Sequence, residues 1–206
     1  MSDILERVHR FRQTNGWLFG TMLFSAGLSL IASFVLSVDA IELARDPSAN
    51  LACNINQVIS CGTVGTSWQA SLLGFPNAFL GLIAEPVVIT IAVAGLAGVK
   101  FPRGFMLAAQ VVYTIGFVFA YWLFFEAMFV IGALCPWCLL VTLSTTLVFV
   151  TLTHVNLRDG NLFLPPRAQR AALAGLRLGV DAFVVVAWLL GLVVLIISHY
   201  GSALLG

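Results

Sequence analysis

The sequence has few charged residues, which make up only 9% of its 206 positions. Soluble domains carry about 25% charged residues, so this composition excludes an ordinary soluble globular protein. Intrinsic disorder is excluded as well, because disordered chains combine low hydrophobicity with a high net charge. Here 60% of the residues are hydrophobic and the formal net charge is only +1. We therefore expect a polytopic membrane protein.

Several other patterns are missing from the sequence. It contains no internal repeat, no nucleotide-binding glycine motif and no basic patch interleaved with aromatic residues, so we expect no nucleic-acid partner. Matching halves with paired broken helices, which would favour a transporter, are not visible either. The alternation of polar and apolar residues that a transmembrane barrel requires is replaced by continuous apolar tracts. We therefore expect an all-α integral membrane protein.

Five apolar tracts are long enough to cross a membrane, since a spanning helix needs about 20 apolar residues. They run over residues 17–38, 77–99, 104–131, 134–154 and 182–198. The third and fourth tracts are almost continuous, and Gly132 with Pro136 marks the turn between them.

The basic residues predict the orientation, because cytoplasmic segments of membrane proteins are enriched in Lys and Arg. With a cytoplasmic N-terminus, all of the ten Lys and Arg residues except Arg45 lie on the cytoplasmic side. Residues 40–76 then form an outer loop, residues 155–181 a basic cytoplasmic connection with an interfacial helix, and residues 200–206 an outer tail. The first apolar tract resembles a signal peptide, but it exceeds the core length of about 7–15 residues, so we expect it to be retained.

All four cysteines fall on the expected outer side, although this topology rests on Lys and Arg alone. Cys53 and Cys61 lie in the outer loop, and Cys135 and Cys138 lie at the outer end of the fourth helix. Pro136 suits the first helical position, because its missing N–H needs no partner there. Cys135 is then expected at the N-cap, where the helix dipole lowers the pKa of a thiol and makes it reactive.

Three interpretations fit these four cysteines. Two structural disulfides would describe a non-catalytic membrane protein with a stapled outer loop. A zinc site is less favoured, because structural zinc commonly uses paired short spacings and Cys53 lies far from Cys61 in sequence. We favour a redox relay, because a C-x-x-C motif beside a second cysteine pair suits thiol–disulfide exchange towards a lipid-soluble acceptor. This interpretation includes no metal.

Four features occur in order along the chain: the pair Cys53 and Cys61, then Ser67, then Phe-Pro-Asn-Ala-Phe-Leu-Gly at 75–81, then Cys-Pro-Trp-Cys at 135–138. Their order and spacing resemble the vitamin K epoxide reductase family, and specifically its bacterial branch. The resemblance covers roughly the segment from Trp17 to His154. The DsbB type of quinone-reducing membrane protein carries its C-x-x-C motif in the first outer loop instead.

The resemblance implies a four-helix bundle around a quinone. It places this catalytic bundle at residues 17–154. The basic residues and the apolar tracts add a cytoplasmic N-terminus at 1–16 and a fifth transmembrane helix at 182–199. It further implies that Cys135 and Cys138 form the active-site disulfide and that Cys53 and Cys61 form the shuttle pair. The candidate quinone-binding residues are Ser67, Trp68, Asn77, Phe79 and Thr142.

Thr142 departs from the family pattern, because animal members carry a tyrosine at this position, one turn after the second active-site cysteine. The departure favours simple quinone reduction over epoxide reduction. Many bacterial members carry a fused thioredoxin-like domain after the fifth helix, whereas this chain ends at Gly206. We therefore expect a membrane thiol oxidase of the bacterial inner membrane that contacts lipid and the quinone pool. Its expected partners are a separate periplasmic DsbA-like thioredoxin-fold protein and menaquinone or ubiquinone.

Two acidic residues lie within the apolar tracts, Glu85 in the second and Glu126 in the third. Intramembrane acids are functional candidates, and both are expected in the outer half of the bundle. Proton supply to the quinone and a hydrogen-bonded carboxyl within the bundle are both open interpretations. His9, His154 and His199 lie at the expected membrane edges and are predicted to be interfacial residues.

Overall fold

The computed structural model describes residues 10–205, and within this range five helices are long and apolar enough to cross a membrane. These helices are α2 (Asn15–Arg45), α4 (Ala78–Leu96), α5 (Arg103–Glu126), α6 (Pro136–Arg158) and α8 (Val180–Leu205). The shorter elements are α3 (Cys61–Gly65), the 3-10 helix η1 (Trp68–Ser71), the π-helical turn η2 (Ala127–Ile131) and α7 (Pro166–Leu178). The expectation of an all-α, multi-pass membrane protein is confirmed.

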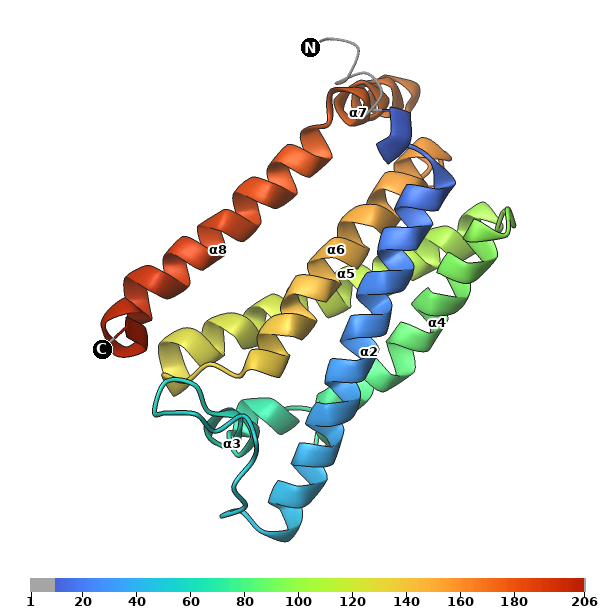
Figure 1. The fold of residues 1–206 in the computed structure, drawn as a ribbon. Helices are drawn as coiled ribbons and strands as arrows, with labels where there is room; N and C mark the ends of the chain where they lie inside the picture. The colour runs from blue at the N-terminus through green and yellow to red at the C-terminus, as the bar shows by residue number, and fades with distance from the viewer. Residues whose placement is uncertain (1–9, 206) are drawn as a thin grey trace.

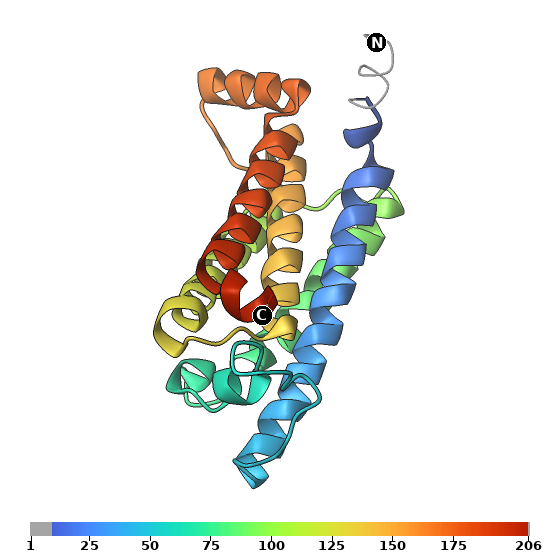
Figure 2. The same cartoon turned by 60° about the vertical axis from the view of Figure 1, so that its left-hand side comes forward.

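Helix α2 lies at the centre of the bundle and packs against both α4 and α6, while α5 packs against α6 (Figure 1). Helix α8 lies outside this group beside α6, and α7 crosses the end of the bundle at which α8 begins (Figures 1 and 2). We call the end at which α2 finishes and α6 begins the cysteine end. The end at which α2 begins and α6 finishes is the opposite end.

The first helix is longer than the sequence predicts. It continues past Val38 to Arg45, so the connecting segment begins at Asp46 and not at residue 40. The apolar tract ends at Asp39, but the chain stays helical because Leu43, one turn further on, is buried against Cys53 and Cys61. Tertiary packing therefore extends the helix beyond the boundary that charge alone indicates.

The turn between α5 and α6 is where the sequence predicts it. Gly132 adopts a left-handed conformation with φ 74° and ends the π-helical turn, and α6 then starts at Pro136. The last span is longer than predicted, because α8 already begins at Val180.

Small residues let α2 and α4 approach each other closely. Serines 25, 29, 33 and 37 follow one another at four-residue spacing on α2, and all four are buried. A Cβ atom added to Gly81 of α4 would lie 2.1 Å from Ser33 Oγ, and one added to Gly95 would lie 2.5 Å from the ring of Phe19. Close packing of small residues is a common way to associate helices in a membrane, where lipid removes the hydrophobic drive between them.

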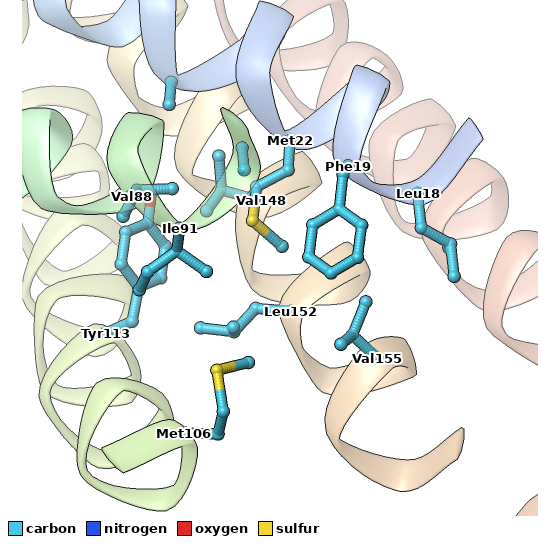
Figure 3. Close-up of a cluster of buried hydrophobic side chains, with 12 residues drawn as sticks. Leu18, Phe19, Met22, Val88, Ile91, Met106, Tyr113, Val148, Leu152 and Val155 are labelled. Carbon is cyan, nitrogen blue, oxygen red and sulfur yellow. The ribbon is translucent and has the colours of Figure 1, made fainter. Parts of the chain in front are cut away.

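A cluster of large apolar side chains fills the half of the bundle nearer the opposite end (Figure 3). Helices α2, α4, α5 and α6 all contribute to it, through residues that include Phe19, Met22, Val88, Ile91, Met106, Val148 and Leu152. We call this cluster the apolar layer. It closes the bundle interior beneath the polar residues of the cysteine end.

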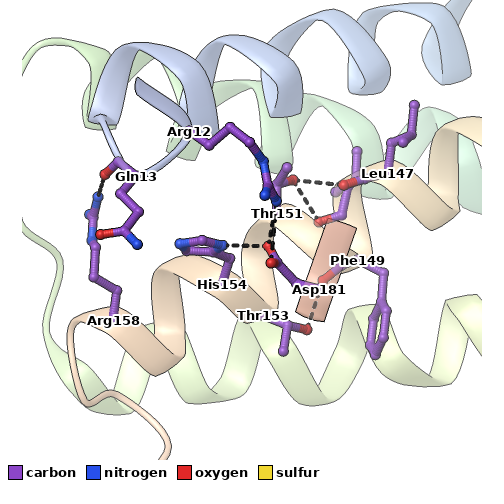
Figure 4. A network of polar contacts seen from close by, with 10 residues as sticks. Arg12, Gln13, Leu147, Phe149, Thr151, Thr153, His154, Arg158 and Asp181 are labelled. Atoms are coloured by element: carbon purple, nitrogen blue, oxygen red, sulfur yellow. Dashed lines mark hydrogen bonds and ion pairs between the residues drawn. The ribbon is translucent and has the colours of Figure 1, made fainter. Parts of the chain in front are cut away.

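At the opposite end, charged groups join the N-terminal segment to α6 and α8 (Figure 4). Asp181 Oδ2 lies 2.8 Å from His154 Nδ1, and Arg12 donates to both carboxylate oxygens of Asp181 at 3.2 Å. The prediction that His154 is an interfacial residue is wrong, because its side chain is only 3% exposed. The buried imidazole has a charged hydrogen-bond partner, Asp181, from a distant part of the chain.

Of the two other histidines, the structure describes only His199. His199 packs its ring against Phe129 and Tyr200. His9 lies outside the described residues.

We expect Gly81→Ala to destabilise the protein, because the new methyl group would overlap Ser33. Overpacking of this kind costs about 1–3 kcal/mol, which thermal unfolding in detergent would detect. The loss should shrink when Gly81→Ala is introduced into a Ser33→Gly background and compared with Ser33→Gly alone. Gly20→Ala on α2 is the control, because a Cβ there meets no atom within 4 Å. Equal effects at both glycines would contradict the close α2–α4 packing.

We expect Asp181→Ala to destabilise the protein by about 1.5–3 kcal/mol, since it removes the shared acceptor of Arg12 and His154 and hydrogen bonds to charged groups are worth about this much. Asp159→Ala is the matched control, because Asp159 is 41% exposed in its ion pair with Arg158. Exposed ion pairs contribute at most about 1 kcal/mol, so the unfolding temperature of Asp159→Ala should be close to that of wild type. A smaller effect at Asp181 than at Asp159 would show that the Asp181 contacts do not anchor α8.

Candidate functional site

A short backbone pairing joins the loop after α2 to the segment before α6. The Ser60 N–H donates to the Leu134 carbonyl at 3.0 Å, and the Leu134 N–H donates to the Val58 carbonyl at 2.7 Å. Together they form an isolated parallel bridge between Ile59 and Leu134. The next residues along the two segments are Cys61 and Cys135, which pack in one buried cluster. The bridge therefore brings together the two cysteine pairs, which are far apart in sequence.

The first pair, Cys53 and Cys61, forms a disulfide. Asn54 holds the loop around it, because its Oδ1 accepts the Gly62 N–H at 2.8 Å and the Ser60 hydroxyl at 3.2 Å. The carboxylate of Asp39 on α2 lies 3.9 Å from Cys53 Sγ. Zinc binding by all four thiolates is not compatible with this arrangement, because two of the sulfurs are bonded to each other.

The second pair, Cys135 and Cys138, is reduced. Cys135 is the N-cap of α6, its Sγ accepts the Cys138 N–H at 3.3 Å, and Pro136 occupies the first turn, as the sequence predicts. Hydrogen bonds from the Cys138 thiol, and then from the backbone N–H groups of Cys138 and Trp137, lower the pKa of Cys135, although burial and the charge of Asp39 oppose them. Cys135 is therefore the thiol that ionises readily.

A cavity of about 630 Å³ occupies the cysteine end between α2, α4, α5, α6 and the loop. Cys61, Cys135 and Cys138 line it, and Cys53 does not. Most of its other lining residues are apolar, and the polar ones are Ser29, Ser33, Asp39, Thr66, Ser67, Gln69, Ser71, Asn77, Glu85, Tyr113, Thr142 and Thr145. Three sulfur atoms thus share a largely apolar cavity with a limited set of hydrogen-bonding groups.

Three of the five candidate quinone-binding residues line this cavity. The Thr142 hydroxyl donates to the Cys138 carbonyl at 3.0 Å, and the Ser67 hydroxyl donates to the Val64 carbonyl at 2.6 Å. Asn77 donates through Nδ2 to the Gln69 carbonyl at 2.6 Å, while its buried Oδ1 has no partner among the described residues.

The other two candidates do not line the cavity. Trp68 is 63% exposed and packs against Trp122, and Phe79 stacks on Phe75. The 3-10 helix η1 turns Trp68 outward and its neighbour Gln69 inward, so proximity in sequence to Ser67 does not indicate which side chain faces the cavity. The structure therefore lends no support to a quinone contact by either residue.

Several polar cavity residues escape the sequence analysis, among them Asp39 and Gln69. Asp39 directly follows the first apolar tract, and this position is the only feature of the sequence that distinguishes it. Gln69 is buried, and its Nε2 donates to Glu126 at 3.0 Å, which ties η1 to the end of α5. A buried glutamine in a loop has no recognisable pattern in the sequence, because only the tertiary contact with Glu126 accounts for it.

We predict that the thiolate absorbance of the reduced pair rises at a lower pH than that of an ordinary cysteine. Hydrogen bonds to Cys135 stabilise its thiolate, and Cys53 and Cys61 contribute no signal while they form a disulfide. In Cys138→Ala the rise should move to higher pH, because the thiol that donates to Cys135 is removed. An unchanged titration in Cys138→Ala would contradict the assignment of that hydrogen bond.

Comparison with known proteins agrees with this geometry. No curated protein matches the chain. The family model described as the vitamin K epoxide reductase family matches residues 21–153, a segment that contains all four cysteines and nearly all of the bundle that encloses the cavity. The match covers more than half of the chain. The chain therefore belongs to the vitamin K epoxide reductase family, whose members are membrane thiol–disulfide oxidoreductases.

Proposed function

We propose that the protein is a membrane thiol oxidase that regenerates disulfides in a separate thioredoxin-fold partner and passes the electrons to a membrane quinone. One observation carries the proposal. An oxidised cysteine pair and a reduced cysteine pair lie in one buried cluster, and three of their sulfurs share one cavity. A loop stapled only for stability would need no second, reduced pair beside it.

The loop disulfide takes electrons from the partner. A thiolate of a reduced DsbA-like protein attacks Cys53, forms a mixed disulfide and releases Cys61 as a thiolate. One difference between the sulfurs supports this direction. Cys61 lines the cavity with Cys135, whereas Cys53 does not.

Exchange then continues inside the protein. The Cys61 thiolate attacks Cys135 in the Cys135–Cys138 disulfide and releases Cys138 as a thiolate at the cavity. The second thiol of the partner then attacks the partner's sulfur in the mixed disulfide with Cys53. This step releases the oxidised partner and leaves Cys53 as a thiolate. Cys53 then attacks Cys61, so the loop disulfide re-forms and Cys135 becomes a thiol. The loop disulfide and the free Cys135 and Cys138 of the structure correspond to this stage.

The cavity fits a quinone. Its volume of about 630 Å³ lies within the range of about 300–1,000 Å³ that is common for ligand sites. Its lining is mainly apolar, and two buried oxygens on its wall, Asn77 Oδ1 and Glu85 Oε2, have no hydrogen-bond partner among the described residues. Asn77, Ser67 and Thr142 would hold the head group. A bound quinone supplies the two-electron acceptor that returns Cys135 and Cys138 to the disulfide.

The same residues favour a particular substrate. Thr142 occupies the place of the tyrosine of animal members, which supports reduction of menaquinone or ubiquinone and not of an epoxide. The proposed location is the bacterial inner membrane, with residues 17–154 as the catalytic bundle and the cysteine end facing outward. The opposite end is rich in basic residues, which occur in the α4–α5 connection, at Arg158 and in α7. This enrichment supports a cytoplasmic assignment of that end.

Quinone reduction by the purified protein tests the proposal. With dithiothreitol as the electron donor, wild type should reduce a ubiquinone or menaquinone analogue and Cys138→Ser should not. Cys61→Ser should keep most of the dithiothreitol-driven activity, because dithiothreitol can reduce the Cys135–Cys138 disulfide directly. It should lose the activity driven by a reduced thioredoxin-fold partner, which depends on the loop pair.

Ser198→Ala on the exposed surface of α8 is the control and should behave as wild type. Full turnover by Cys138→Ser would overturn the proposed order of electron transfer. A folded wild-type protein that reduces neither quinone would favour the alternative of a non-catalytic protein with a disulfide-stapled loop.

A further inference from the structure

One buried acid lies on the wall of the cavity that holds the cysteines. Glu85 of α4 is 4% exposed and lines the cavity together with Cys135 and Cys138. Glu126, the other acid predicted within the spans, does not line the cavity and instead accepts a hydrogen bond from Gln69. The two acids that the sequence leaves equivalent are therefore in different environments.

The two oxygens of Glu85 are also in different environments. Oε1 accepts hydrogen bonds from Ser29 Oγ on α2 at 2.9 Å and from Tyr113 Oη on α5 at 3.3 Å. Oε2 is buried and has no partner within the described residues. A buried carboxylate oxygen without a hydrogen bond is costly, whereas the O–H of a carboxylic acid can donate to a ligand in the cavity. The pattern matches a protonated carboxyl whose carbonyl oxygen is held in place and whose hydroxyl is free to donate.

The apolar layer determines where such an acid can exchange its proton. Val88, one turn beyond Glu85 on α4, is buried in this layer with Ile91, Val148 and Leu152 (Figure 3). These four side chains offer no hydrogen-bonding group and lie between Glu85 and the charged network of Asp181. The buried polar residues beside this layer, Gln110 and Asn156, are hydrogen-bonded to each other. The other titratable groups on the cavity wall are Asp39, Tyr113, Cys135 and Cys138, with Cys61 when its disulfide opens. The titratable groups that share a cavity with Glu85 therefore belong mainly to the cysteine end.

We propose that Glu85 is the proton-transfer residue of the cavity, giving a proton to the bound quinone and taking one back from the cysteine end. This inference rests on the proposed function. Oxidation of Cys135 and Cys138 to a disulfide releases two electrons and two protons, and reduction of a quinone to a quinol consumes the same number. Glu85 donates its carboxyl proton to one quinone oxygen, and its carboxylate then takes up one of the two thiol protons. The other thiol proton reaches the second quinone oxygen through the cavity, so Glu85 ends each turnover as it began.

Glu85→Gln tests the proposal, because an amide can keep the hydrogen bonds from Ser29 and Tyr113 but cannot release a proton in turnover. We expect kcat for dithiothreitol-driven quinone reduction to fall about 100-fold, at the lower end of the usual contribution of general acid–base catalysis. KM for the quinone should stay close to the wild-type value, and the pH profile of kcat should lose the limb that Glu85 causes. Thiol exchange between the two cysteine pairs, followed by trapping the Cys61–Cys135 mixed disulfide, should be unchanged. Glu85→Asp should recover part of kcat.

Glu126→Gln is the matched control, since it removes an acid at the same end that does not line the cavity, and it should keep the wild-type pH profile. A second readout needs no turnover. The infrared carbonyl band of a protonated buried carboxyl should be present in wild type and in Glu126→Gln and absent in Glu85→Gln. Full kcat with an unchanged pH profile in Glu85→Gln, or a band that survives that substitution, would overturn the inference alone. Wild-type protein without quinone turnover would overturn the proposed function together with it.

Discussion

The site depends on the backbone pairing between residues 58–60 and Leu134. A loop of this length has many conformations in isolation, and two hydrogen bonds to the segment before α6 select the one that brings Cys61 beside Cys135. The same pairing precedes the start of α6, where the Cys138 N–H donates to the sulfur of Cys135 and stabilises negative charge on it. Burial of Leu43 against this cluster extends α2 beyond its apolar tract, so even the length of the first helix follows from how the loop is held.

The bundle is divided into two unlike halves. Towards the opposite end, large apolar side chains from four helices fill the interior and leave little room for a ligand (Figure 3). Towards the cysteine end, α2 presents serines and α4 presents Gly81, so these helices come close while a cavity stays open between them and α5. Small side chains here therefore have two effects, because they allow helix contact and leave space for a ligand. In the proposed function, this apolar half of the bundle would keep electron and proton transfer at the cysteine end.

The polar groups of the cysteine end have separate tasks because their contacts differ. Glu126 binds Gln69 and so fixes η1 over the cavity, and Asn77 binds the backbone of the same segment. Glu85 is held by hydroxyls from two other helices, which leaves its second oxygen unpaired. Asp39 lies near the sulfurs, where its charge opposes ionisation of Cys135 while the backbone N–H groups favour it. The pKa of that thiol is lowered chiefly by the hydrogen bond from the Cys138 thiol and is opposed chiefly by burial, while the helix start and Asp39 make smaller contributions.

The sequence by itself determined the class of the protein, the number of spans, the turn at Gly132 and the N-cap at Cys135, and its motif order indicated the family. These features depend on local composition and on neighbours within one turn, which a sequence displays directly. Tertiary structure alone decided that Glu85 lines the cavity and Glu126 does not, that Trp68 faces outward, and that His154 is buried beside Asp181. Each of these outcomes depends on the rotation of one helix against another or on a contact between distant segments. Apolar tracts exposed to lipid have little amphipathic pattern to reveal which face turns inward, so packing supplies that information.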